Sequence, residues 1–275
     1  MRKRRNVVLA AVLLVVSAGL VLAHDMFLKP EDFFTGPNRE VLVRLLNGTF
    51  SQSENSIARE RLLDVSVVSP AGRERIDTAR WNATGDTSSF RFTTGGEGTY
   101  VLGTSTRANI IPLEGKDFNE YLASDGVPDV LEARRKAGEL DRPARERYAK
   151  HVKALLQVGE ARSEHFAAVL GYPAEIVPLT NPYTLKPGAT LEVRITVRGQ
   201  PVANQYVLFG GRTATGGRIA QRNTRSDGEG VAKIPLSQPG TWYVKFIHME
   251  RLTGDSAADY ESTWGTLSFA VTKGE

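Results

Sequence analysis

The sequence contains no cysteine, and this absence excludes several classes of protein at once. Without thiols the chain forms no disulfide, offers no thiolate to a metal ion, and has no site for the lipid anchor of a lipoprotein. The stability of the fold therefore depends on a buried core. With 275 residues, 41% of them hydrophobic, the chain is long enough for one large globular domain or two of ordinary size.

The sequence also lacks an excess of charge once its first residues are set aside. Arg2, Lys3, Arg4 and Arg5 are the charged residues of the first 23. Without these four, the 35 Lys and Arg residues fall to 31, against 31 Asp and Glu. A chain without net positive charge has no electrostatic basis for binding nucleic acid, so we expect no nucleic-acid partner.

Only one long hydrophobic run is present, and it follows the basic residues at the N-terminus. Val21 and Ala23 place small or apolar residues at the −3 and −1 positions of a cleavage site. This pattern predicts a signal peptide over residues 1–23, and hence a periplasmic or otherwise exported protein. A cut after Gly19 is one alternative. Retention of the run as an N-terminal membrane anchor is another.

Cleavage after Ala23 would make His24 the first residue of the mature protein. A terminal histidine carries two nitrogens, the free α-amine and the imidazole, which can chelate one metal ion together. The plainer alternative is that His24 is one of the arbitrary residues with which many exported proteins begin.

Two stretches of the chain follow the same plan. Residues 37–44 and 187–194 each consist of a turn with proline and then apolar residues at alternate positions. Residues 98–101 and 240–244 each begin with Gly-Thr and continue with aromatic residues and valine. Alternation with a period of two is typical of half-buried strands. The offsets between the copies, 150 and 142 residues, nearly agree.

The repeat predicts a mainly β fold with two immunoglobulin-like β-sandwich domains, over residues 24–113 and 172–275. The second copy has the clearer pattern, with alternating, β-branched and aromatic residues. Its predicted strands are Leu191–Val197, Gln205–Phe209, Val231–Ile234, Trp242–His248 and Trp264–Val271.

Between the copies, residues 114–171 have a helical period, which predicts a helical insert. One helix is expected from Asp117 to a stop at Gly126, and a second from Pro128 to a stop at Gly138. A third helix is expected between an N-cap at Asp141 and Gly159, and a short fourth from Ser163 through Phe166 and Leu170. In the third helix one face would hold Tyr148, Val152 and Leu155.

Histidine is scarce, and its four positions are His24, His151, His165 and His248. His151 and His165 have no second ligand at metal-binding spacing, so packing or surface roles are expected for both. His248 ends a predicted strand, and the loop after it carries Asp259 and Glu261. We therefore expect a metal site made of His24, His248 and an oxygen from Glu261 or Asp259. The alternative for His248 is a hydrogen-bonded residue at a strand end.

Several short motifs follow one another along nearly the whole mature chain. They are His24-Asp25 with Phe27 and Pro30, residues 148–159, Asn181-Pro182-Tyr183 with Lys186-Pro187-Gly188, Ile247-His248-Met249, and Tyr260-Glu261-Ser262 with Trp264. In this order they resemble the motifs of an exported family of unknown function, many of whose members are labelled periplasmic components of cobalt/nickel uptake transporters. The resemblance implies export, β-sandwich domains, nickel or cobalt as the bound ion, and a membrane transporter component as partner. The general affinity order of divalent ions adds copper as a possibility.

No catalytic motif is present: the sequence has neither the Gly-x-Ser-x-Gly of serine hydrolases nor a phosphate-binding Gly-rich loop with its Lys-Ser/Thr. We therefore expect a non-enzymatic, periplasmic transition-metal-binding protein that is accessory to nickel/cobalt uptake. One alternative is an envelope module that binds a protein or glycan, with incidental histidines. Another is a copper-dependent oxidative enzyme, because copper oxygenases of polysaccharides also place an N-terminal histidine on a β-sandwich.

Overall fold

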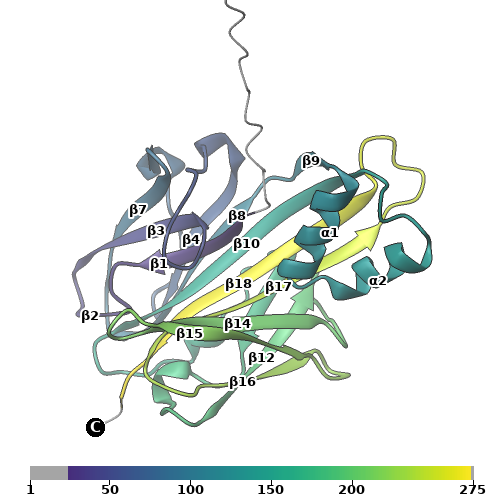
Figure 1. Ribbon diagram of the computed structural model, residues 1–275. Helices are drawn as coiled ribbons and strands as arrows, with labels where there is room; N and C mark the ends of the chain where they lie inside the picture. Colours follow the sequence, from purple (N-terminus) through teal and green to yellow (C-terminus); the bar gives the residue numbers. More distant parts are fainter. Residues whose placement is uncertain (1–23, 274–275) are drawn as a thin grey trace, which may run out of the picture.

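The computed structural model describes residues 24–273 and is mainly β, as expected (Figure 1). The expected signal peptide, residues 1–23, lies outside the described residues. No helix within residues 24–273 is long and apolar enough to cross a membrane.

A ten-stranded sheet forms the centre of the molecule. Eight of its strands are hydrogen-bonded side by side in one continuous order, which we call the main path. The other two, β2 (Phe34–Thr35) and β9 (Asn109–Leu113), pair with β10 outside that order. The main path runs through β15 (Arg218–Arg225), β14 (Tyr206–Thr213), β17 (Gly240–Arg251), β18 (Tyr260–Val271), β10 (Ala144–Val158), β8 (Gly98–Thr106), β4 (Leu62–Ser69) and β5 (Gly72–Arg75).

Two four-stranded sheets cover the central sheet. The first contains β1 (Asp25–Pro30), β3 (Glu40–Gly48), β7 (Thr87–Thr93) and β6 (Asn82–Thr84) in that order. The second contains β11 (Ala174–Pro178), β12 (Thr190–Val197) and β13 (Gln200–Pro201), with β16 (Val231–Pro235) also paired to β12.

The two small sheets lie on opposite faces of the central sheet. On β8, Tyr100 and Leu102 belong to the core that Val43 of β3 shares, whereas Val101 between them belongs to the core of Val193 on β12. Because successive side chains of a strand point to opposite faces, these two cores are separated by the sheet. We call the face under β1 and β3 the N-face and the face under β11 and β12 the C-face.

The strand order has an internal symmetry. On either side of the β10–β18 pair the sheet continues in matching order, with β8, β4 and β5 on one side and β17, β14 and β15 on the other. The β1-β3-β7 set likewise matches β11-β12-β16. The two halves therefore share one continuous sheet. All five strands expected in the second copy are present, and β15 is an additional strand that its polar sequence did not indicate.

The helical segment is confirmed only in part. Helices α1 (Gly115–Ser124) and α2 (Pro128–Lys136) form where expected. The expected fourth helix is a single turn, η3 (Glu164–Ala167). The other one-turn 3₁₀ helices in residues 24–273 are η1 (Arg59–Arg61), η2 (Thr78–Arg80) and η4 (Pro182–Thr184).

The expected third helix is wrong, because residues 144–158 form the strand β10. Its alanine, lysine, arginine and leucine residues favour a helix locally. In the fold this segment pairs in parallel with β18 and antiparallel with β8 and β9. Hydrogen bonds and burial on both faces outweigh the local preference, and the apolar run Ala154 to Leu156 is buried as in any central strand.

Strand β10 also carries an unusual number of buried polar side chains. Glu146, Lys150, His151, Lys153 and Gln157 are all at most 4% exposed. Each polar head needs a partner, because an unpaired charge in the core is costly. Lys153, for example, donates to a carboxylate of β11, with 2.9 Å between its Nζ and Oε2 of Glu175. These partners join β10 to both small sheets.

His151 makes a prediction about pH. Burial lowers the pKa of its imidazole from 6.5 to about 4. Between these pH values the unfolded chain binds a proton that the native state does not, so stability is lost as the pH falls. We expect His151→Asn to remove about 3 kcal/mol of the decline in unfolding free energy between pH 7 and pH 4. Urea unfolding at several pH values measures this. A pH dependence parallel to that of wild type would contradict it, and His165→Asn controls for loss of a histidine as such.

Candidate functional site

His24 lies directly before β1, on the N-face. Its carbonyl oxygen accepts a hydrogen bond from the Nζ of Lys150, a buried residue of β10. Antiparallel pairing of β1 with β3 begins at the next residue, with Asp25 opposite Gly48 and Met26 opposite Asn47. His24 is therefore held against the central sheet by its main chain, while its imidazole remains partly exposed, with 22% of its side-chain area accessible.

The His24 imidazole faces a carboxylate. Its Nδ1 atom lies 3.5 Å from Oε2 of Glu54. Glu54 follows the β3 strand end, and its backbone N–H donates to the carbonyl of Asn47 at 2.9 Å. The loop between them folds closely over Gly48, where a Cβ atom would lie only 2.6 Å from the carbonyl oxygen of Gln52. Glycine at this position therefore permits the loop path that brings Glu54 to His24.

A second buried lysine holds Asp25. The Nζ of Lys245, on β17, lies 2.5 Å from Oδ2 of Asp25 and 3.2 Å from Oδ1 of Asp125, at the end of α1. Burial alone would lower the pKa of Lys245, but the two carboxylates outweigh it and raise the pKa above its ordinary value. Burial raises the pKa of Asp125. The start of β1 is thus tied to both β17 and α1.

Lys150 is the other charged group under the N-terminal strand. Its Nζ lies 4.6 Å from the ring centroid of Trp264, and burial lowers its pKa to about 8. Nearby, Glu146 accepts hydrogen bonds from Tyr121 and Ser262, and burial raises the pKa of its carboxyl group. Charged and aromatic side chains together form the buried layer that contacts His24 through Lys150.

His248 lies on the other face of the central sheet. On β17 the side chains of Lys245 and Ile247 point to the N-face, where Ile247 packs with Trp264 under α1. His248, the next residue, points to the C-face. The structure therefore does not bring His24 and His248 together, and the expected site shared by the two histidines needs correction. The sequence could not show which face of its strand His248 occupies relative to β1.

The two expected carboxylate ligands are engaged in ion pairs. Asp259 accepts from the backbone and side chain of Arg145, with 3.1 Å between its Oδ1 and a guanidinium nitrogen. Glu261 lies on the C-face with His248, where its Oε2 is 2.9 Å from Arg198. His248 and Glu261 thus line one pocket, whereas neither Asp259 nor His24 lines it.

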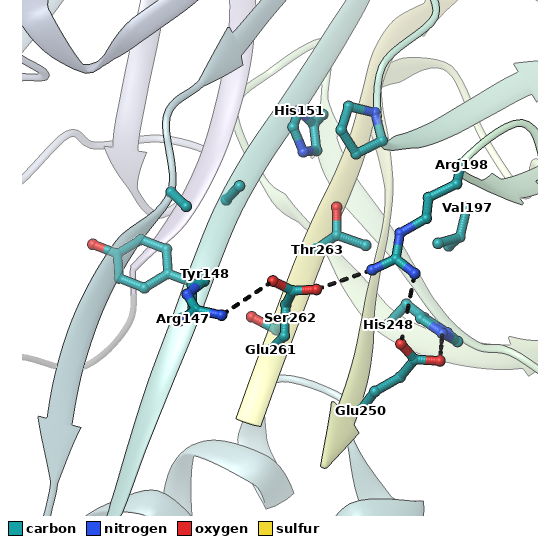
Figure 2. Close-up of a pocket in the computed structure, with 13 residues that line it drawn as sticks. Arg147, Tyr148, His151, Val197, Arg198, His248, Glu250, Glu261, Ser262 and Thr263 are labelled. Atoms are coloured by element: carbon teal, nitrogen blue, oxygen red, sulfur yellow. Dashed lines mark hydrogen bonds and ion pairs between the residues drawn. The ribbon is translucent and has the colours of Figure 1, made fainter. Parts of the chain in front are cut away.

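That pocket, the C-face pocket, has a volume of about 210 Å³. Figure 2 shows the residues that line it, among them His151 from β10, Thr263 from β18, His248 and Glu250 from β17, and Arg198 after β12. His248 donates from Nδ1 to Oε1 of Gln205 at 3.0 Å, because the amide nitrogen of Gln205 already donates to two carbonyls. A neutral His248 therefore keeps its lone pair on Nε2, 3.5 Å from Glu250.

Among residues 24–273, no group of three or more His, Cys, Asp or Glu side chains is arranged to hold a metal ion. The closest arrangements are two pairs, His24 with Glu54 on the N-face and His248 with Glu250 on the C-face. Only the first lies at the position that cleavage after Ala23 would convert into a chain terminus with its own amine ligand.

Sequence reasoning missed Glu54, Lys150 and Lys245. Glu54 lies in a polar loop with no spacing signal toward His24, and its proximity follows from β1–β3 pairing. Lys150 was placed on a helix, so its burial under His24 could not be foreseen. One signal was available: Lys245 interrupts an apolar strand, and a lysine inside such a strand requires a partner.

Two of the solved structures that match this chain have low sequence identity to it. A trypsin-activated α2-macroglobulin from Escherichia coli is 9% identical with a TM-score of 0.25; the match covers 92% of this chain and 16% of that one. A DUF4785 family protein from Legionella pneumophila is 12% identical with a TM-score of 0.23, with coverages of 79% and 50%. This chain thus spans half or less of each protein, and TM-scores this low bear on neither fold nor function.

No curated protein matches the sequence. A family match does cover most of the chain, over residues 21–250, including His24, Glu54 and strands β1 to β16. The chain therefore belongs to the family described as Domain of unknown function (DUF4198).

Proposed function

We propose that the exported, processed protein binds one divalent transition-metal ion at its N-terminus, through the α-amine and imidazole of His24 and the carboxylate of Glu54. The observation that carries this proposal is the 3.5 Å separation between Nδ1 of His24 and Oε2 of Glu54. Two ligand atoms, each about 2.1 Å from an ion and at a tetrahedral angle, are about 3.4 Å apart. The two side chains are therefore already spaced as ligands of one ion.

The nitrogen that faces Glu54 is the one that chelation requires. Of the two imidazole nitrogens, only Nδ1 is near enough to the α-amine of the same residue to form a compact chelate ring with it. At the first residue of a processed chain, the amine and Nδ1 would supply two nitrogen ligands and Glu54 an oxygen. Deprotonating an α-amine with a pKa of about 8 costs only about 1.4 kcal/mol at pH 7, which ion binding readily exceeds.

The surroundings of His24 support a preorganised site. Lys150 bonds the His24 carbonyl, Lys245 bonds the Asp25 side chain, and the hydrogen bond from Glu54 to Asn47 fixes the facing loop. A ligand that is already held in place loses less conformational entropy on binding. The ion would meet an ordered terminal residue instead of a free chain end.

The ligand set indicates which ions would bind. Two nitrogens and one carboxylate oxygen, without a thiolate, favour Ni²⁺ and Cu²⁺, with Co²⁺ and Zn²⁺ weaker. The motif resemblance to proteins labelled as nickel and cobalt uptake components supports nickel or cobalt as the natural cargo. We therefore propose a periplasmic metal-binding protein that is accessory to nickel/cobalt uptake and delivers its ion to a membrane transporter component.

The first test concerns the α-amine. A processed protein that starts at His24 is compared with one that carries a single extra glycine before His24. The extra residue converts the amine into an amide, so we expect the affinity for Ni²⁺ and Cu²⁺ to fall by about 100-fold, or about 2.7 kcal/mol, in calorimetric titrations. Equal affinity of the two forms would contradict a terminal chelate. Mass spectrometry of the exported protein identifies its first residue.

The second test concerns Glu54. We expect Glu54→Gln to weaken binding of the same ions by about 10-fold, because an amide is a poorer ligand than a carboxylate of the same shape. Glu31→Gln is the matched control, since Glu31 is an exposed carboxylate that pairs only with Arg44. His248→Asn should bind metal like wild type. A loss in His248→Asn as large as that in His24→Ala would instead support a site shared by the two histidines.

A further inference from the structure

The C-face pocket contains polar atoms that the fold does not satisfy. Nε2 of His151 and Oγ1 of Thr263 are buried without a hydrogen-bond partner among the described residues, and both side chains line the pocket. His151 is only 1% exposed, and its other nitrogen, Nδ1, is 2.9 Å from the hydroxyl of Ser105. The bond to Ser105 orients the ring, which lies in the wall of the pocket (Figure 2). Unsatisfied buried polar atoms are uncommon in native proteins and require a reason.

The opening of the pocket is lined by charges of alternating sign. Glu261 lies 3.8 Å from Arg147 and 2.9 Å from Arg198, and Arg198 in turn lies 4.0 Å from Glu250 (Figure 2). Beyond Glu250, the imidazole of His248 follows at 3.5 Å. A simple anion would meet the carboxylates of this row, and a simple cation would meet its guanidinium groups. A ligand with one charge of each sign matches both, because guanidinium binds carboxylate and carboxylate binds ammonium.

The size of the pocket limits the ligand further. About 210 Å³ is smaller than the roughly 300–1,000 Å³ of sites for drug-sized ligands. Ala149, Pro173 and Val197 make much of the wall apolar. The space suits a molecule with one small apolar group beside its charged groups.

We infer that the C-face pocket binds a small zwitterion of the free α-amino-acid class. The carboxylate would bind Arg198, the ammonium group would bind Glu250 or Glu261, and the rest of the molecule would lie against the wall that Thr263 and His151 line. This site shares no residue with the proposed metal site on the N-face, and neither inference depends on the other.

The test is a titration of the purified protein with L-alanine, L-serine and L-valine, followed through the ring signals of its four histidines in carbon–proton NMR spectra. Propionate and ethylamine are the matched probes, since each keeps one charge of alanine and lacks the other. We expect the signals of His151 and His248 to shift with at least one amino acid, and the affinity to exceed that of either single-charge analogue by about 10-fold. Glycine added before His24 should leave these shifts unchanged.

Variants locate the binding. Arg198→Gln should weaken amino-acid binding by about 10-fold, because it removes the exposed guanidinium that would bind the carboxylate. Arg194→Gln is the control, as Arg194 is an exposed arginine of β12, four residues before Arg198 and outside the pocket. Thr263→Val should also weaken binding. The inference is overturned if none of the three amino acids shifts the His151 signal at about 10 mM. Equal binding of propionate, or equal affinity in Arg198→Gln, would also overturn it.

Discussion

The rest of the structure depends on the pairing of β10 with β18. These parallel strands join two copies of one strand plan into a continuous sheet, so each copy contributes four strands of the main path. Parallel strands are usually covered on both faces of their sheet. The two small sheets and α1 provide this cover, and all three hydrophobic cores include residues of β10 or β18.

Because the two copies share a sheet, the molecule has two faces with different chemistry. The N-face holds the first residues after the expected cleavage site, above two buried lysines. The C-face holds a small pocket with an unsatisfied imidazole and a row of paired charges. Backbone alternation along β17 places Lys245 on one face and His248 on the other, only three residues apart.

Burying the charges under His24 costs free energy of desolvation, which suggests that these residues are retained because they hold neighbouring groups in place. Removing one partner of a buried ion pair typically destabilises a protein by about 3–5 kcal/mol, while apolar replacement of both partners is often neutral. Lys150 and Lys245 are both buried in strands of the central sheet. What they provide is a fixed location for the carbonyl of His24 and the side chain of Asp25. Such precision matters at a ligand site more than in an ordinary core.

The sequence by itself determined the elements whose signals are local. Alternating apolar residues predicted five strands of the second copy, and the turn and stop residues around Gly126, Pro128 and Gly138 predicted α1 and α2. The similar order of turns and strands predicted the repeat. These features depend on backbone geometry over a few residues, which residue types report directly.

The tertiary structure alone decided which residues meet. Residues 144–158 prefer a helix locally, yet form the central strand because pairing with β18 and β8 satisfies their backbone and buries both of their faces. His24 faces Glu54 instead of His248 because β1 pairs with β3 on the N-face of the sheet. Contacts of this kind depend on which face of a shared sheet each strand presents. A single sequence carries no signal for that choice, because both faces of a central strand are buried.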